Sequence, residues 1–182
     1  MQEQFFISTA QKDDCTQIAA LVNSAYRGEY SKKGWTTEAD LIAGSLRIDE
    51  TSLLEMMERP DAVILKCADN DKNICGCVFL QKSGDQLYLG MLAVSPLVQG
   101  RGTGKQLLKA AEEHAGRTHC RSIIMNVISL RHELLAWYKR RGYIPTGETK
   151  PFPRDERFGT PRRPLEFSVL KKDVYPSENN IS

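Results

Sequence analysis

The stretch of residues 99–104, Gln-Gly-Arg-Gly-Thr-Gly, has the composition of an anion-binding turn. It follows a predicted strand at 87–94 and leads into a long amphipathic segment that we expect to be a helix. A helix N-terminus offers N–H groups without partners and a partial positive charge, and glycine lets the backbone approach an anion closely. The spacing therefore predicts that this turn binds a phosphate or a similar group.

Two common glycine motifs do not fit this turn. A P-loop needs glycine at position 99 and Ser or Thr at position 106, and both positions are glutamine. A dinucleotide-binding turn needs its third glycine at position 105, which is lysine, and it follows the first strand of its fold. Here strands and a helix already precede the turn, so neither class of nucleotide-binding enzyme is predicted.

A third pattern, Gln/Arg-x-x-Gly-x-Gly/Ala, fits in full with Gln99, Gly102 and Gly104. Together with the strand residues 89–96 before it and residues 104–108 after it, the chain resembles the GCN5-related N-acetyltransferase (GNAT) superfamily. The resemblance covers most of the chain, because the order of the predicted elements also agrees. It implies that the turn holds the pyrophosphate of acetyl-CoA as cosubstrate.

The resemblance also implies which residues bind the coenzyme. The pantetheine arm is expected to run beside the strand that precedes the turn, and Lys105 is expected near a phosphate. The implied binding residues are Leu92, Ala93, Val94, Gln99, Gly100, Arg101, Gly102, Thr103, Gly104 and Lys105. The same strand and its partner at 123–128 are expected to be splayed, which leaves a slot for the thioester.

The implied reaction is the direct attack of a primary amine on the thioester in a ternary complex, as in an N-acetyltransferase. Residues 134–143 are similar to the family's helix that ends in Tyr-x-x-x-Gly-Phe/Tyr, which implies that Tyr138 is the acid for the leaving thiolate. The chain departs from the family pattern at Arg131, where asparagine is frequent, and at Leu134, where alanine is frequent.

The attacking amine must lose a proton, because a lysine-like amine has a pKa near ~10.4. Many members of the family carry a glutamate on the strand before the turn, but residues 87–94 contain no carboxylate. Glu29 follows the first predicted helix and is the candidate base, acting directly or through a water molecule. His132 and Glu133 are the weaker alternatives.

The first helix–loop region and the proline-rich loop are expected to form the acceptor site. The residues expected there are Tyr26, Arg27, Glu29 and Trp35 in the first region and Phe152, Arg154 and Phe158 in the second, mostly aromatic and arginine side chains. Such a mixture suits a small amine that also carries a carboxylate. A peptide amine is equally compatible with the sequence, and the resemblance makes a homodimer plausible.

The remaining sequence features define the class of protein. The chain has 182 residues and a formal net charge of +2, which argues against a nucleic-acid partner. It has no basic, apolar leader and no apolar run near the ~20 residues that span a membrane, so a cytoplasmic protein without a membrane partner is expected. The cysteines and histidines lack zinc-like spacing, so no metal is expected.

Periodicity predicts one mixed α/β (α+β) domain over residues 1–175, with a C-terminal tail at 176–182. We expect the element order β-α-α-β-β-β-α-β-α-β, a second short helix opening at Thr37 and Glu38, and a loop from 146 to 164. The resemblance implies a mixed, mostly antiparallel central sheet flanked by helices, with the fourth and fifth strands splayed.

A second function remains open beside the enzyme. The missing strand carboxylate and Arg131 are also compatible with a non-catalytic acyl-CoA-binding regulatory module of the same fold.

Overall fold

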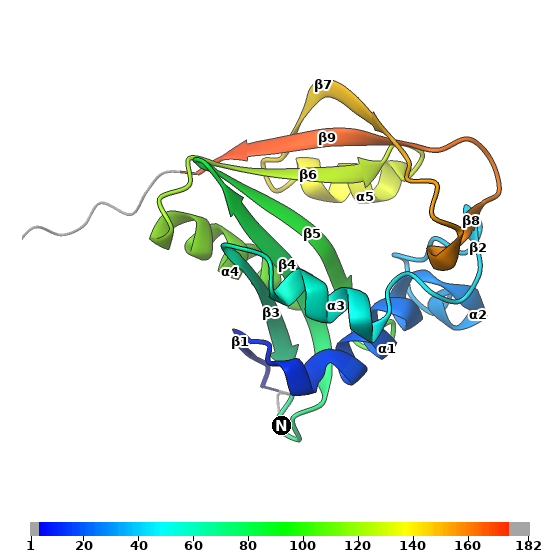
Figure 1. The fold of residues 1–182 in the computed structure, drawn as a ribbon, viewed down its shortest axis with the longest axis horizontal. Helices are drawn as coiled ribbons and strands as arrows, with labels where there is room; N and C mark the ends of the chain where they lie inside the picture. The colour runs from blue at the N-terminus through cyan, green and yellow to red at the C-terminus, as the bar shows by residue number, and fades with distance from the viewer. Residues whose placement is uncertain (1–3, 175–182) are drawn as a thin grey trace, which may run out of the picture.

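A seven-stranded sheet runs through the molecule in the order β1-β3-β4-β5-β6-β9-β7 (Figure 1). The structure is a computed structural model that describes residues 4–174, so the predicted tail at 176–182 lies outside the described residues. The strands are β1 (Phe6–Thr9), β3 (Ala62–Ala68), β4 (Ile74–Ser83), β5 (Gln86–Val94), β6 (Ser122–Ile128), β7 (Ile144–Pro151) and β9 (Glu166–Asp173). In the described part of the chain, no helix is long and apolar enough to cross a membrane.

Helices cover both faces of the sheet (Figure 1). The helices α1 (Cys15–Tyr26) and α3 (Glu50–Met57) pack on one face of β3, β4 and β5, and α4 (Thr103–Arg117) packs on the other. The helix α5 (His132–Lys139) follows β6 and adds its apolar side chains to the core on the α4 side. The central strand β4 is buried along most of its length, which explains its nearly continuous apolar sequence.

The strands β5 and β6 separate soon after they meet. They are the one parallel pair of the sheet, and their register covers only residues 86–88 against 122–124. Beyond that point β5 is irregular, because its pairing with β4 shifts between Cys77 and Phe79 and Met91 has a φ of 52°. Figure 1 shows the two strands diverging toward the end of β5. The predicted mixed, mostly antiparallel sheet and its splay are confirmed.

The predicted short helix at Thr37 is wrong. The N–H groups of Leu41 and Ile42 both donate to the carbonyl of Glu38, which closes a single turn, and the chain then enters the short strand β2 (Ile42–Ala43). This strand pairs with β8 (Thr160–Pro161). A short helix not predicted from the sequence, α2 (Gly28–Ser31), lies just before this region.

The predicted loop at 146–164 is also wrong in its first part. Residues up to Pro151 form β7, which pairs with β9 at the edge of the sheet and is exposed along its whole length. Proline is tolerated there because an edge strand has one side without ladder hydrogen bonds. The pairing shifts register between Pro145 and Thr149, which removes the regular alternation that identifies a strand.

The α4 face of the core supplies the first test. Leu107 is completely buried against β4, so Leu107→Ala should lower the free energy of unfolding by about 2–5 kcal/mol. The matched control is Leu97→Ala, because Leu97 is 62% exposed and its loss should cost less than about 0.5 kcal/mol. Urea unfolding of both variants measures the difference, and equal costs would contradict this packing.

Candidate active site

A cleft of about 460 Å³ opens where β5 and β6 separate. The end of β5, the glycine turn, α5 and the segment after α1 each contribute to its wall. The lining residues are Tyr26, Trp35, Thr36, Leu92, Val94, Gln99, Gly100, Gly102, Thr103, Gly104, Lys105, Glu133, Leu134, Trp137, Tyr138, Arg140 and Arg141. The turn and Tyr138, which lie far apart in the sequence, therefore face the same space.

The glycine turn leaves its backbone open to a ligand. Gly100 and Gly102 have φ values of 84° and 86°, and a Cβ atom at either position would meet nothing within 4 Å. Gly102 is the N-cap of α4 and has no side chain to cap the helix. The N–H of Gln106 donates to the carbonyl of Gly102 and so makes the first hydrogen bond of the helix. The preceding N–H groups and the absence of acidic residues in the first turn make this end an anion cradle.

Gln99 holds a neighbouring loop against this turn. Its Oε1 accepts from the Trp35 N–H at 2.8 Å, and its Nε2 donates to Thr36 Oγ1 at 2.8 Å and to the Val94 carbonyl at 3.0 Å. Gly34 lies so close that a Cβ there would come within 2.5 Å of the Gln99 side chain. The glutamine of the motif therefore fixes the wall of the cleft, while the glycines provide its open backbone.

Two tryptophans line the cleft beside the glycine turn. The rings of Trp35 and Trp137 lie 6.3 Å apart, and the guanidinium of Arg141 lies 3.8 Å above the Trp137 ring. Arg141 also donates to the carbonyl of Trp137 at 2.8 Å, which anchors this cation on α5. This part of the cleft therefore combines flat apolar surface with positive charge.

Tyr138 lines the cleft and is only 5% exposed. Burial raises the pKa of its phenol above the ordinary range, and the nearby Tyr26 adds to this, whereas Arg131, Arg47 and Arg141 oppose it. Among residues 4–174 its hydroxyl has no hydrogen-bond partner. Tyr138 thus stays protonated at neutral pH and has a proton to donate to a ligand.

A second cavity of about 60 Å³ lies between the separated strands and touches the cleft. Tyr26, Leu92, Leu134 and Tyr138 line both spaces. The Tyr26 hydroxyl donates a short hydrogen bond to the carbonyl of Leu92, so the end of α1 is tied to the irregular part of β5. We call this second space the inner cavity.

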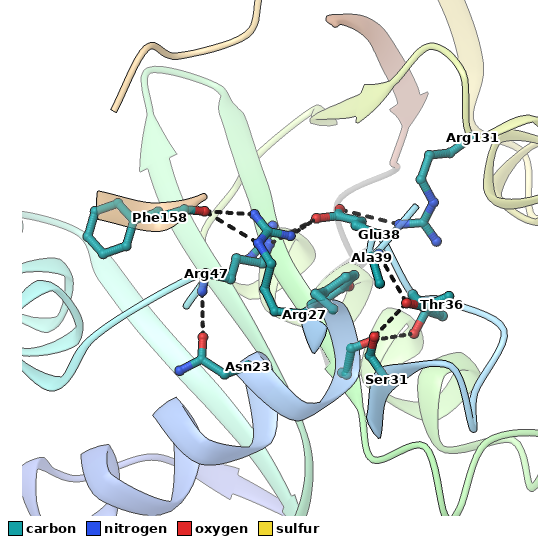
Figure 2. Close-up of polar contacts among 12 residues, drawn as sticks. Asn23, Arg27, Ser31, Thr36, Glu38, Ala39, Arg47, Arg131 and Phe158 are labelled. Atoms are coloured by element: carbon teal, nitrogen blue, oxygen red, sulfur yellow. Dashed lines mark hydrogen bonds and ion pairs between the residues drawn. The ribbon is translucent and has the colours of Figure 1, made fainter. Parts of the chain in front are cut away.

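One buried carboxylate holds three arginines beside the inner cavity (Figure 2). Glu38 forms a short ion pair with Arg27 and lies 3.3 Å from Arg131 and 4.0 Å from Arg47. Arg27 also donates to the carbonyl of Phe158 from its Nε and Nη2 atoms. This cluster joins α1, the turn after α2, the start of α5 and the 156–158 segment around the cavity.

Comparison with known proteins agrees with this arrangement. The family model described as "Acetyltransferase (GNAT) family" matches residues 26–143, which include the turn, the cleft and Tyr138. The chain belongs to the GNAT acetyltransferase family. No curated protein matches the chain.

Solved structures share the GNAT fold at low sequence identity. The ribosomal-protein-S18-alanine N-acetyltransferase from Escherichia coli has a TM-score of 0.70 and 12% identity, covering 98% of this chain and 99% of that one. An N-acetyltransferase from Staphylococcus aureus Mu50 has a TM-score of 0.68 and 14% identity, with 94% and 99% covered. The yncA protein from Salmonella typhimurium, solved with its cofactor acetyl-CoA, has a TM-score of 0.68 and 18% identity, with 94% and 95% covered.

Most of the predicted coenzyme residues of this GNAT protein lie together in the cleft. The cleft is lined by Leu92, Val94, Lys105 and most residues of the turn. Two of the predicted coenzyme residues do not line it. Ala93 is buried in the core on the α1 face, because its side chain points opposite to those of its neighbours along β5. Arg101 is exposed and does not line the cleft.

The predicted base lies away from this cleft. The Glu29 side chain is 87% exposed on α2 and pairs with Lys32 at 2.8 Å, so the structure does not bring it together with Tyr138. His132 is exposed at the start of α5, whereas Glu133 lines the cleft. In residues 4–174 no three His, Cys, Asp or Glu side chains are grouped to hold a metal ion.

The predicted acceptor residues are only partly assembled. Tyr26 and Trp35 line the cleft, but Arg27 is used by Glu38 and by the Phe158 carbonyl. Phe152 packs on another ring at 5.3 Å between centroids, and Arg154 is exposed. The sequence pattern did not indicate Glu38, Arg47 or Trp137, because their partners come from separate segments.

The Glu38 cluster supplies the second test. Glu38→Gln leaves three arginines without their common carboxylate, so the free energy of unfolding should fall by about 3–5 kcal/mol. Glu29→Gln is the matched control, since its exposed pair with Lys32 should contribute less than about 1 kcal/mol. A similar small loss for both variants in urea unfolding would show that Glu38 does not hold this region together.

Proposed function

We propose that this GNAT protein transfers an acetyl group from acetyl-CoA to a primary amine in a ternary complex. The observation that carries this proposal is the junction between the two spaces. The cleft reaches Tyr138 from the glycine turn, and the inner cavity reaches the same side chain from between the strands. A donor in the first space and an amine in the second would meet beside Tyr138.

The residues of the cleft fit coenzyme A. The open backbone at Gly100 and Gly102 and the bare N-terminus of α4 suit a pyrophosphate. Lys105, Arg140 and Arg141 surround this end of the cleft with positive charge. Because the pairing of β5 with β6 covers only residues 86–88, the end of β5 has no strand beside it on that side, which leaves room for an extended pantetheine arm.

Acetyl-CoA would supply the activated acyl group, and the protein would position it and manage the protons. The amine nitrogen forms the new amide bond as the carbon–sulfur bond breaks, and Tyr138 donates its proton to the departing sulfur. Glu133 is the carboxylate that lines the cleft, and it has no ion pair among the described residues. It therefore replaces Glu29 as the candidate that accepts the amine proton, which it would do through a water molecule.

A non-catalytic acyl-CoA-binding module is the second candidate function. It is favoured by the position of the carboxylates, because Glu29 lies outside both spaces and Glu38 is held by arginines. Both candidates predict coenzyme binding. Release of free thiol from acetyl-CoA in the presence of amines separates them, because the module would release none.

Coenzyme binding is tested by a pair of glycine variants. Gly102 and Gly147 have φ values of 86° and 87° and equal open space, so valine imposes the same backbone strain at each. Gly102→Val also places a side chain over the anion cradle, so calorimetry should show coenzyme A binding weakened by about tenfold or more. Gly147→Val should bind normally, and equal affinities for the two variants would contradict the cradle.

The role of Tyr138 is tested by its removal and by pH. Tyr138→Phe should lower kcat by about a hundredfold or more, measured by thiol release, whereas the exposed Tyr30→Phe should not. A donor is active below its pKa, and burial raises the pKa of Tyr138. The wild-type rate should therefore rise as the amine deprotonates and should not fall near the ordinary tyrosine pKa of ~10. An unchanged kcat in Tyr138→Phe would remove the acid role.

A further inference from the structure

The inner cavity has a positive wall with too little counter-charge. Arg47 and Arg131 line this cavity, and Arg27, which does not line it, forms an ion pair with Glu38, which does. Glu38 is the carboxylate that pairs with each of the three, so one negative charge faces three positive ones. Charges held away from water are costly unless they are paired, and this imbalance favours the entry of an anion.

The three guanidinium groups differ in how much of their bonding capacity is used. Arg27 makes three hydrogen bonds, one to Glu38 and two to the carbonyl of Phe158. Arg131 donates one N–H to Glu38 at 3.3 Å. Arg47 stands 4.0 Å from Glu38, and its guanidinium makes no hydrogen bond within residues 4–174. The donors of Arg47 are therefore available to a ligand in the cavity.

The position of Arg47 is fixed although its donors are unused. Its guanidinium lies 4.6 Å from the centre of the Tyr26 ring, which holds the cation over an aromatic face. Its backbone N–H donates to the Asn23 side chain at 2.6 Å, as Figure 2 shows. The side chain is 29% exposed and borders the inner cavity. A fixed arginine fork with free donors matches the geometry of a carboxylate.

We propose that the acceptor is a small amino carboxylate whose carboxylate binds Arg47 and Arg131 in the inner cavity while its amine faces Tyr138. This proposal rests on the proposed acetyltransferase function and names its substrate class. A cavity of about 60 Å³ has room for a few water molecules or for one carboxylate group. The same cavity touches Tyr26, Leu92 and Tyr138, so anion and amine can belong to one small molecule.

The first test compares acceptors in the wild-type protein. Amino acids and β-alanine are each paired with their own carboxamide, and thiol release from acetyl-CoA is measured for both members. Loss of a charge-assisted bidentate contact lowers affinity by about 10–100-fold, so kcat/KM should favour the carboxylates by that factor. Equal or higher values for the carboxamides throughout the panel would overturn the proposal.

The second test removes the free cation. Arg47→Gln replaces the cation with a shorter, uncharged polar side chain, and the preference for carboxylate over carboxamide should fall by about 10–100-fold. The matched control is Arg59→Gln, because Arg59 packs its guanidinium 5.8 Å from the Phe79 ring and lines neither space. That control should keep the wild-type preference. A full preference in Arg47→Gln would show that Arg47 does not bind the carboxylate.

Direct binding separates failure of this site from failure of the enzyme. Calorimetry of the same amino acids and carboxamides needs no turnover. If no amine releases thiol but the carboxylates still bind more tightly, and Arg47→Gln removes that difference, the acetyltransferase proposal fails and the anion site stands. If amines release thiol without any preference for carboxylates, the enzyme stands and the anion site is wrong.

Discussion

The early end of the pairing between β5 and β6 is the constraint on which the site depends. Only three residue pairs join these parallel strands, and the irregular backbone at Met91 turns β5 away from its neighbour. Strand backbone deep in the protein is normally saturated by its ladder. Here the separation leaves two adjoining spaces, the cleft that runs from the glycine turn to Tyr138 and the inner cavity between the strands.

Two polar contacts close these spaces from the side of α1. Gln99 ties the loop at residues 35–36 to the glycine turn, and Glu38 ties the next residues of the same segment to α1 and α5. One short stretch of chain therefore forms a wall of the cleft and part of the inner cavity. This arrangement explains why Glu38 is buried although a charged residue in a loop is usually solvated.

The grouping of the glycine turn with Tyr138 in one cleft could be predicted from the sequence, and the arginine cluster beside the inner cavity could not. The glycine turn and Tyr138 lie within local motifs whose spacing fixes their geometry. The Glu38 cluster draws its arginines from positions 27, 47 and 131, and no spacing in a single sequence shows that these meet. The resemblance implies Glu29 as the base because its segment is where the family often builds the acceptor site, but on α2 its side chain is exposed to solvent. The edge strand β7 was hidden by its prolines and complete exposure.

The most direct test of this account is a crystal structure of the protein with acetyl-CoA. The account predicts the pyrophosphate on the N–H groups at the start of α4, the pantetheine arm beside the end of β5, and the thioester sulfur within hydrogen-bond reach of the Tyr138 hydroxyl. A coenzyme bound outside the cleft, or one whose thioester points away from Tyr138, would contradict it.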